Sequence, residues 1–198
     1  SRGQFGGLSA EVWPMSVVML AGFDIVLIET VGVGQREADI ARLCDTTCYV
    51  AQPGSGDSVQ FLKAGILEVP HILVVNKEDM GNVARRTLAE LKAALNREHP
   101  DGDWEVPVLA TSATKHAGIE TLADVIHQHH NALKAQQKLV SRRRRYQSYW
   151  IHKRLQEEFG SFGIEQLGGE QLLLTQLEEN ELDLLQHYES LRARLNKV

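Results

Sequence analysis

The feature that most constrains this chain is a series of short apolar stretches, each followed by a polar or glycine-containing loop. They occupy residues 23–28, 45–51, 71–75 and 106–111. Runs of this length that are rich in β-branched residues predict buried strands. Segments with helical periodicity separate them, so the sequence predicts an α/β fold with a mainly parallel sheet flanked by helices. Strands of such a sheet end at one edge, where open α/β folds bind ligands.

Helices are expected before, between and after these strands. The segments with helical spacing of apolar residues are 9–20, 36–43, 59–67, 82–96, 119–137, 141–159 and 170–195. Pro14 weakens the expectation for the first of them, because proline lacks a backbone donor.

The first strand end combines an acid with glycines. Glu29 closes the stretch 23–28, and Gly32 and Gly34 follow it. Glycine allows the backbone to approach a bound group closely. A carboxylate and a glycine-rich turn at this edge of a sheet suit a nucleotide phosphate with its magnesium ion, although many α/β enzymes place an acid and a glycine there.

Two later strand ends point to the base of that nucleotide. Asn76-Lys77-Glu78-Asp79 follows the stretch 71–75. The Asp79 carboxylate can accept from the two N–H donors on one edge of guanine, a pair that adenine lacks. Asn76 can bond the acceptor edge or brace the loop, and the stem of Lys77 can pack along the base.

The loop after residues 106–111 supplies the third element of the predicted site. Ser112, Ala113 and Thr114 follow that strand, and a backbone N–H of this loop could bond the guanine carbonyl. The order and spacing of the three strand ends agree, so we interpret them as a guanine-nucleotide site. A polar strand-to-helix loop is the alternative interpretation of each motif.

These motifs resemble those of the MeaB/ArgK-type P-loop GTPases, the G-protein chaperones of adenosylcobalamin-dependent methylmalonyl-CoA mutase. The resemblance covers roughly residues 1–135. Its matching pieces are Gly6-Gly7-Leu8, Ala21-Gly22-Phe23-Asp24, Glu29-Thr-Val-Gly-Val-Gly-Gln35, Pro53-Gly-Ser-Gly-Asp57, Gln60 with Lys63-Ala-Gly65, and Asn76-Lys-Glu-Asp79.

The resemblance implies roles for residues whose chemistry alone does not decide them. It implies that the chain binds GTP and GDP with Mg²⁺, and that Glu29 contributes to the metal site through water. It places Gly32 where its N–H bonds the γ-phosphate. Gln35 would orient the attacking water or lie at the surface. It also implies that a segment relays nucleotide state to the mutase, and the polar residues of that segment are Asp57, Gln60 and Lys63.

One element of the family pattern is missing from the sequence. No G-x-x-x-x-G-K-[ST] loop, which cradles phosphates with backbone N–H groups, occurs in the 198 residues. We therefore expect this chain to be the carboxyl-terminal part of a longer GTPase. Alone, it should hydrolyse GTP poorly or not at all.

Composition argues against some classes of binding partner and indicates the cellular compartment. The net charge of −5 argues against a dedicated nucleic-acid binder, and no apolar run reaches the length that spans a membrane. Cys44 and Cys48 do not form a disulfide framework and suit a reducing compartment. We expect a cytoplasmic protein, or one of the mitochondrial matrix if the source is eukaryotic.

The last third of the chain has a different pattern. Residues 1–138 are assigned to the GTPase domain and residues 139–198 to a helical extension, which the resemblance favours as a dimerisation arm of a homodimer. The basic run 142–145 suggests a solvated face or an acidic partner. His127, His129 and His130 are interpreted as structural or surface residues, since no cysteine or acid is paired with them.

The expected function is therefore that of a GTP-hydrolysing chaperone. It would gate cofactor loading or protection of an adenosylcobalamin-dependent acyl-CoA mutase such as methylmalonyl-CoA mutase. Two alternatives remain open: a metallochaperone GTPase that inserts a metal, and a non-catalytic mutase-binding remnant if the phosphate loop is truly absent.

Overall fold

The computed structural model describes residues 11–30, 42–54, 69–95, 104–179 and 183–197. The chain divides into two compact units. The described residues from 28 to 136 form the first, which we call the sheet unit. The described residues from 11 to 27 and from 137 to 197 form the second, the helical unit. The sequence prediction placed a single boundary at residue 138. The helical unit contains residues from before and from after the sheet unit in the sequence.

A parallel sheet forms the centre of the sheet unit. Its described strands are β1 (Cys48–Ala51), β2 (Ile72–Val75) and β3 (Val108–Ala110), hydrogen-bonded in the order β1-β2-β3. Tyr49 pairs with Leu73, and Leu73 pairs with Val108. The expected α/β fold with a parallel sheet is confirmed.

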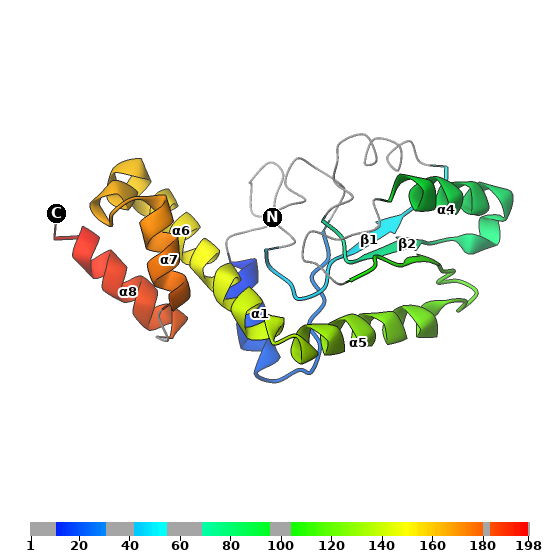
Figure 1. Cartoon of the computed structure of the whole chain (residues 1–198), viewed down its shortest axis with the longest axis horizontal. Helices are drawn as coiled ribbons and strands as arrows, with labels where there is room; N and C mark the ends of the chain where they lie inside the picture. The colour runs from blue at the N-terminus through cyan, green and yellow to red at the C-terminus, as the bar shows by residue number, and fades with distance from the viewer. Residues whose placement is uncertain (1–10, 31–41, 55–68, 96–103, 180–182, 198) are drawn as a thin grey trace. The chain divides into compact units, whose positions relative to one another are not determined.

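The core of this unit lies against β2. All four β2 residues are buried, as expected for a central strand covered on both faces. Helix α4 (Asn82–Ala94) packs Ala84 and Leu91 against Leu73 and Val75. Figure 1 shows α4 and α5 (Ile119–Ala135) on opposite sides of the strands. These helices leave the carboxyl ends of the strands available for loops.

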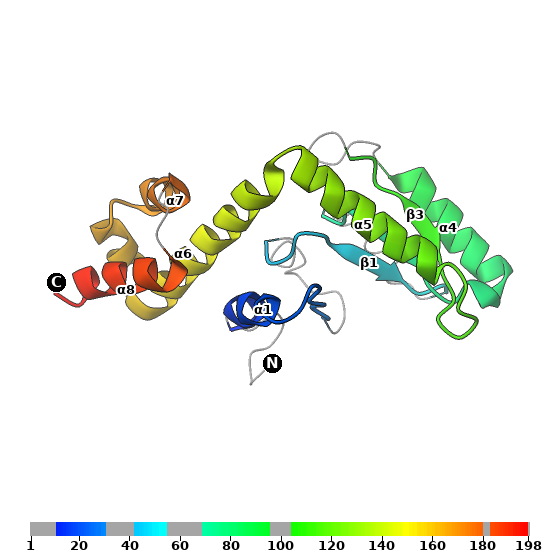
Figure 2. The same cartoon turned by 90° about the horizontal axis from the view of Figure 1, so that it is seen from below.

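The described residues of the helical unit form four helices. They are α1 (Val12–Leu20), α6 (Lys138–Gln166), α7 (Glu170–Glu179) and α8 (Leu184–Leu195). Figure 2 shows α7 and α8 lying against α6. An aromatic row connects three of the helices: the ring centroids of Trp13 and Trp150 are 5.9 Å apart, and those of Trp150 and Tyr188 are 5.8 Å apart.

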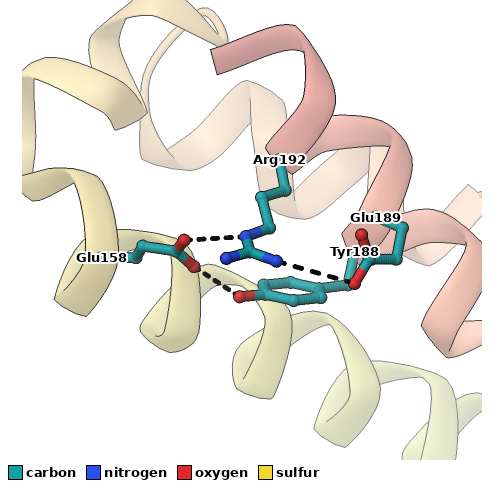
Figure 3. A network of polar contacts seen from close by, with 4 residues as sticks. All are labelled: Glu158, Tyr188, Glu189 and Arg192. Atoms are coloured by element: carbon teal, nitrogen blue, oxygen red, sulfur yellow. Dashed lines mark hydrogen bonds and ion pairs between the residues drawn. The ribbon is translucent and has the colours of Figure 1, made fainter. Parts of the chain in front are cut away.

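A carboxylate fixes α8 on α6. The Tyr188 hydroxyl donates to Glu158 Oε2 at 2.6 Å, and Arg192 Nε donates to Glu158 Oε1 at 2.7 Å (Figure 3). The Tyr188 hydrogen bond, followed by that of Arg192, lowers the pKa of Glu158. Both carboxylate oxygens of Glu158 thus bind side chains of α8.

The prediction of a strand at residues 23–28 is wrong. This segment pairs with no strand among the described residues, and Phe23, Ile25 and Leu27 are exposed by 62%, 60% and 87%. A strand needs a neighbour to satisfy its backbone N–H and C=O groups, and apolar composition alone does not provide one.

Two helical predictions also need comment. Pro14 falls in the first turn of α1, where its missing N–H removes no helical hydrogen bond, so the helix forms despite it. The single helix expected at 170–195 is two helices, α7 and α8. The helix expected at 59–67 and nearly all of the one at 36–43 lie outside the described residues.

In the ranges that the structure describes, none of the helices combines the length and the apolar character needed to cross a lipid bilayer.

Candidate guanine-base site

The loop after β2 presents Asn76 and Asp79 at the carboxyl edge of the sheet. The Asn76 N–H donates to the carbonyl of Ala51 at 3.1 Å, which extends the β1–β2 pairing by one residue. Lys77 then adopts a left-handed conformation with φ of 59°, and a 3₁₀ turn, η2 (Glu78–Met80), follows. This reversal exposes Asp79 at the loop surface.

The loop after β3 is bonded directly to the first loop. The Thr111 N–H donates to the Val75 carbonyl at 2.8 Å, and the Glu78 N–H donates to the Thr111 carbonyl at 2.9 Å. Ser112 and Ala117 form an isolated antiparallel bridge that closes the second loop. The two loops therefore occupy a fixed position relative to each other.

Ser112 holds the Asp79 carboxylate. Its side chain is buried, and its hydroxyl donates to Asp79 Oδ1 at 2.5 Å. The Lys115 N–H donates to the same hydroxyl oxygen at 3.2 Å, which directs the Ser112 proton toward Asp79. The Thr114 hydroxyl lies 3.3 Å from Ser112 Oγ. Asp79 is thus oriented by a residue of the neighbouring strand end.

Asn76 is braced in a similar way. Its Oδ1 accepts from the Thr111 hydroxyl at 3.4 Å and from the Ala113 N–H at 3.3 Å. Both donors belong to the second loop, so the Asn76 side chain links the two strand ends. Of the two roles considered for Asn76, bracing of the loop is the one that these contacts provide.

The charge at Asp79 suits a recognition carboxylate. The Ser112 hydrogen bond is the largest cause that lowers the pKa of Asp79, and its own backbone N–H, Lys115 and Lys77 lower it further. Asp79 is therefore ionised at neutral pH, with one oxygen held by Ser112. An ionised carboxylate at an exposed loop can accept two N–H donors from one edge of a base.

The structure brings part of the predicted site together. Residues Asn76, Lys77, Asp79, Ser112, Ala113 and Thr114 all lie in the two bonded loops. Glu29 is described and exposed, and no contact among the described residues joins it to these loops. The remaining predicted residues, Gly32, Gln35, Asp57, Gln60 and Lys63, lie outside the described residues.

Two contributors were missed from the sequence. Thr111 braces Asn76, and Lys115 supplies both an N–H for Ser112 and a positive charge that acts on Asp79. The sequence shows that both residues lie close to Ser112 at the end of a predicted strand. It does not show that Thr111 contacts Asn76, which is 35 residues away.

The histidines of α5 have different environments. His129 is buried and lies 2.8 Å from the Thr46 hydroxyl, whereas His127 is exposed. No group of three His, Cys, Asp or Glu side chains in the described ranges could hold a metal ion.

Comparison with known proteins decides the family. A sequence model described as the methylmalonyl Co-A mutase-associated GTPase MeaB matches residues 1–163. This chain belongs to the MeaB family. Within that family, a Pyrococcus abyssi protein with a GTPase name is 40% identical over 162 residues, which are 80% of this chain and 47% of that protein.

Further MeaB-family relatives match to a similar extent. Escherichia coli GTPase ArgK is 33% identical over 80% of this chain and 49% of its own length. The Caenorhabditis elegans methylmalonic aciduria type A homolog, a mitochondrial protein, is 31% identical over 81% of this chain and 41% of its own length. The chain spans about half the length of the curated relatives it matches.

A solved structure shares the fold. The crystal structure of a LAO/AO transport system kinase superposes with a TM-score of 0.62 at 30% identity, covering 76% of this chain and 49% of that one. The expected resemblance to MeaB/ArgK-type GTPases is therefore confirmed.

Proposed function

We propose that this chain binds the guanine base of GTP and GDP through the loops that follow β2 and β3. The observation that carries the proposal is the ionised Asp79 carboxylate, held by Ser112 and kept charged by its surroundings. Two parallel acceptor positions on one exposed carboxylate select a base with adjacent N–H donors, which guanine has and adenine lacks.

We further propose that the whole protein is a GTPase chaperone that gates cofactor loading or protection of an adenosylcobalamin-dependent acyl-CoA mutase. The family description names a mutase-associated GTPase, and the Caenorhabditis elegans relative carries the name of a methylmalonic aciduria protein. A homodimer formed through the helical unit is part of this proposal. Because the sequence holds no G-x-x-x-x-G-K-[ST] loop, the chain alone is expected to turn over GTP slowly or not at all.

The remaining roles follow the family resemblance. Glu29 is an exposed carboxylate, a ligand type that Mg²⁺ prefers, and we assign it to the metal of the bound nucleotide. Gly32 and Gln35 are assigned to the γ-phosphate and the attacking water. Coupling to the mutase is assigned to Asp57, Gln60 and Lys63.

Base recognition is tested by exchanging Asp79 for asparagine. Xanthine carries a carbonyl where guanine carries its amino group, so the amide of Asp79→Asn can donate to that carbonyl and accept from the ring N–H. We expect the variant to lose GDP affinity by at least about tenfold and to gain affinity for xanthosine diphosphate. Isothermal titration with GDP, XDP and ADP gives the three constants.

The matched control is Glu78→Gln, a change of charge on the neighbouring exposed side chain. It should leave the preference for GDP over ADP and XDP unchanged. If Asp79→Asn binds GDP as the parent does, the assignment of the base to this loop is wrong.

The mutase role requires a separate assay. Reactivation of a cobalamin-depleted mutase by the polypeptide of the complete gene should depend on GTP and not on added transition metal. Dependence on the metal would support metal insertion instead. Dependence on neither would support a non-catalytic binding role.

A further inference from the structure

At the amino end of the sheet, opposite to the base loops, two histidines are buried in contact with each other. His71 directly precedes β2 and is 2% exposed, and His129 on α5 is 1% exposed. Their ring centroids lie 4.4 Å apart. Trp104 meets His129 edge-on, with ring centroids 4.7 Å apart. We call His71, His129, Trp104 and the two threonines bonded to them, Thr46 and Thr47, the imidazole cluster.

The hydrogen bonds of His71 fix its protonation state. The Thr47 N–H donates to His71 Nδ1 at 3.0 Å in a buried environment. A nitrogen that accepts a hydrogen bond carries no proton, so His71 is the neutral tautomer with its proton on Nε2. A second proton would go to Nδ1, where it would face the Thr47 N–H and replace this hydrogen bond by two opposed donors.

The cluster connects four segments of the sheet unit. The His71 N–H donates to the Thr47 carbonyl at 2.8 Å, and the Trp104 indole N–H donates to the His71 carbonyl at 2.8 Å. The Thr46 hydroxyl and His129 Nδ1 are 2.8 Å apart. Residues before β1, before β2 and before β3 thus meet the second half of α5 here, so a change at His71 acts on all four segments.

The surroundings of the cluster oppose new charge. Most of the Cys48 thiol is enclosed by protein although the residue reaches the surface, and this burial, followed by the neighbouring Cys44, raises the pKa of Cys48 to about 11. Protonation of one imidazole would also place a positive charge against the other ring, where a second proton would be repelled. The charged and titratable side chains on the segments that meet here are Arg42, Cys44, Asp45, Cys48, Glu105, Asp124, His127, His130 and Lys134.

We propose that the imidazole cluster is an acid-sensitive latch, in which protonation of His71 breaks the Thr47–His71 bond and releases Trp104 and the second half of α5 from the amino end of the sheet. The folded state holds His71 neutral, whereas the released state takes up a proton near the ordinary histidine pKa of about 6.5. The open-to-closed ratio is therefore constant above that pH. Below it, the open-to-closed ratio rises by about tenfold per pH unit for one proton.

The test uses Trp104 as a local reporter in the full chain. The variant Trp13→Phe/Trp150→Phe removes the two tryptophans of the helical unit and leaves Trp104. We expect its emission to change between pH 7.5 and 5 while the far-ultraviolet circular dichroism stays constant. Below about pH 6.5, the protection of the Thr47 amide against hydrogen exchange, corrected for the intrinsic rate, should fall by about tenfold per pH unit.

Three variants separate the latch from other causes. In His71→Asn, the amide oxygen replaces Nδ1 as acceptor for Thr47 but does not titrate, so the pH response should disappear. His127→Asn, on the exposed face of the same helix, should respond as the parent does. Asp45 directly precedes Thr46 in the sequence, and Asp45→Asn should shift only the midpoint, because removal of a negative charge lowers the pKa of an imidazole.

The proposal is overturned by a Thr47 amide and a Trp104 emission that stay constant from pH 7.5 to 5 in the parent. A response that persists in His71→Asn also overturns it. Should that variant fail to fold, the parent's amide and emission titrations still decide the question. Neither readout requires nucleotide, so the result is independent of the proposed function.

Discussion

At the scale of single residues, the proposed base recognition depends on a side chain that would not touch the base. Ser112 is buried, donates to Asp79 and accepts the Lys115 N–H. It therefore orients the Asp79 carboxylate and helps to keep it charged. Asp79 itself is exposed, and its lowered pKa depends first on this one hydrogen bond.

Ser112→Ala should weaken GDP binding by about fivefold at pH 7 without unfolding the chain. The pKa of Asp79 should rise toward its ordinary value once the hydrogen bond is lost. Since binding needs the carboxylate, GDP affinity is present above the Asp79 pKa and is lost as the pH falls through it. The variant should lose affinity at a higher pH than the parent, in titrations from pH 7 to 4. Coincident pH profiles would contradict this role of Ser112.

Gly118 directly follows the same loop and lies against the end of β3. Its φ is 69°, and a Cβ added there would overlap the carbonyl oxygen of Ala110 at the end of β3. Gly118→Ala should lower the free energy of unfolding by about 2 kcal/mol or more, because it adds a backbone clash to an unfavourable conformation. Urea titration measures the loss.

Gly81 tests a backbone conformation without a clash. Its φ is 66° with a ψ of −117°, outside the left-handed region of Gly118, and nothing lies within 4 Å of an added Cβ. Gly81→Ala should therefore cost about 2 kcal/mol from the conformation alone. A loss of only about 1 kcal/mol in Gly118→Ala, the cost of its left-handed conformation, would show that the contact with Ala110 is unimportant.

At the scale of elements, one carboxylate bonds α6 to α8 in addition to the ring contact of Trp150 with Tyr188. Glu158 has its two oxygens bound by Tyr188 and Arg192 of α8. The pKa of Glu158 is lowered from its ordinary 4.5 by these bonds, so its contribution to stability is present above the unfolded pKa. That contribution is lost as the pH falls through the folded pKa.

Glu158→Gln should destabilise the helical unit at pH 7, and the difference from the parent should shrink below about pH 4.5. Denaturant unfolding of both proteins between pH 7 and 3, followed by the fluorescence of Trp150, measures the difference. Glu165→Gln, an exposed residue of the same helix, is the matched control. A difference that is independent of pH would mean that the bonds act without the charge.

Helices and strands that are marked by their own residues could be predicted from the sequence. Those that form only beside a particular neighbouring strand or helix could not. Strands β2 and β3 and their loops were predicted because apolar runs end in specific polar residues. Residues 23–28 have the same composition but no strand beside them among the described residues. The division between α7 and α8 follows no glycine or proline. Asp183, a residue type that favours helix starts and whose carbonyl accepts the His187 N–H, was the signal available.

At the scale of the whole molecule, the helical unit is not contiguous in sequence. Helix α1 belongs to it, with Trp13 stacked on Trp150 and Glu11 3.6 Å from Arg154 of α6. The sheet unit occupies the sequence between them. A linear reading of the chain could not find this arrangement, because periodicity reports the apolar face of a helix and not the helix that covers it.

A protease site placed at Gln136 tests this organisation. After cleavage, the carboxyl-terminal fragment should remain bound to the amino-terminal one, because α1 is packed on α6. Trp13→Ala should weaken the association by roughly tenfold or more, since truncation of a buried tryptophan costs several kcal/mol. Size-exclusion chromatography of the cleaved protein measures it. Met15→Ala, at an exposed position of α1, should have no effect, and separation of the unmodified fragments would contradict the assignment.

The bond between Ser112 and Asp79 has a consequence for how ligands of this protein can be found. It joins the loops of two neighbouring strands, so any molecule that binds Asp79 in this arrangement also favours the native pairing of β2 with β3. Binding of such a ligand then raises the melting temperature by mass action. A melting curve recorded with each candidate compound therefore becomes an assay for binding at this loop. It works even for a polypeptide that does not hydrolyse its ligand.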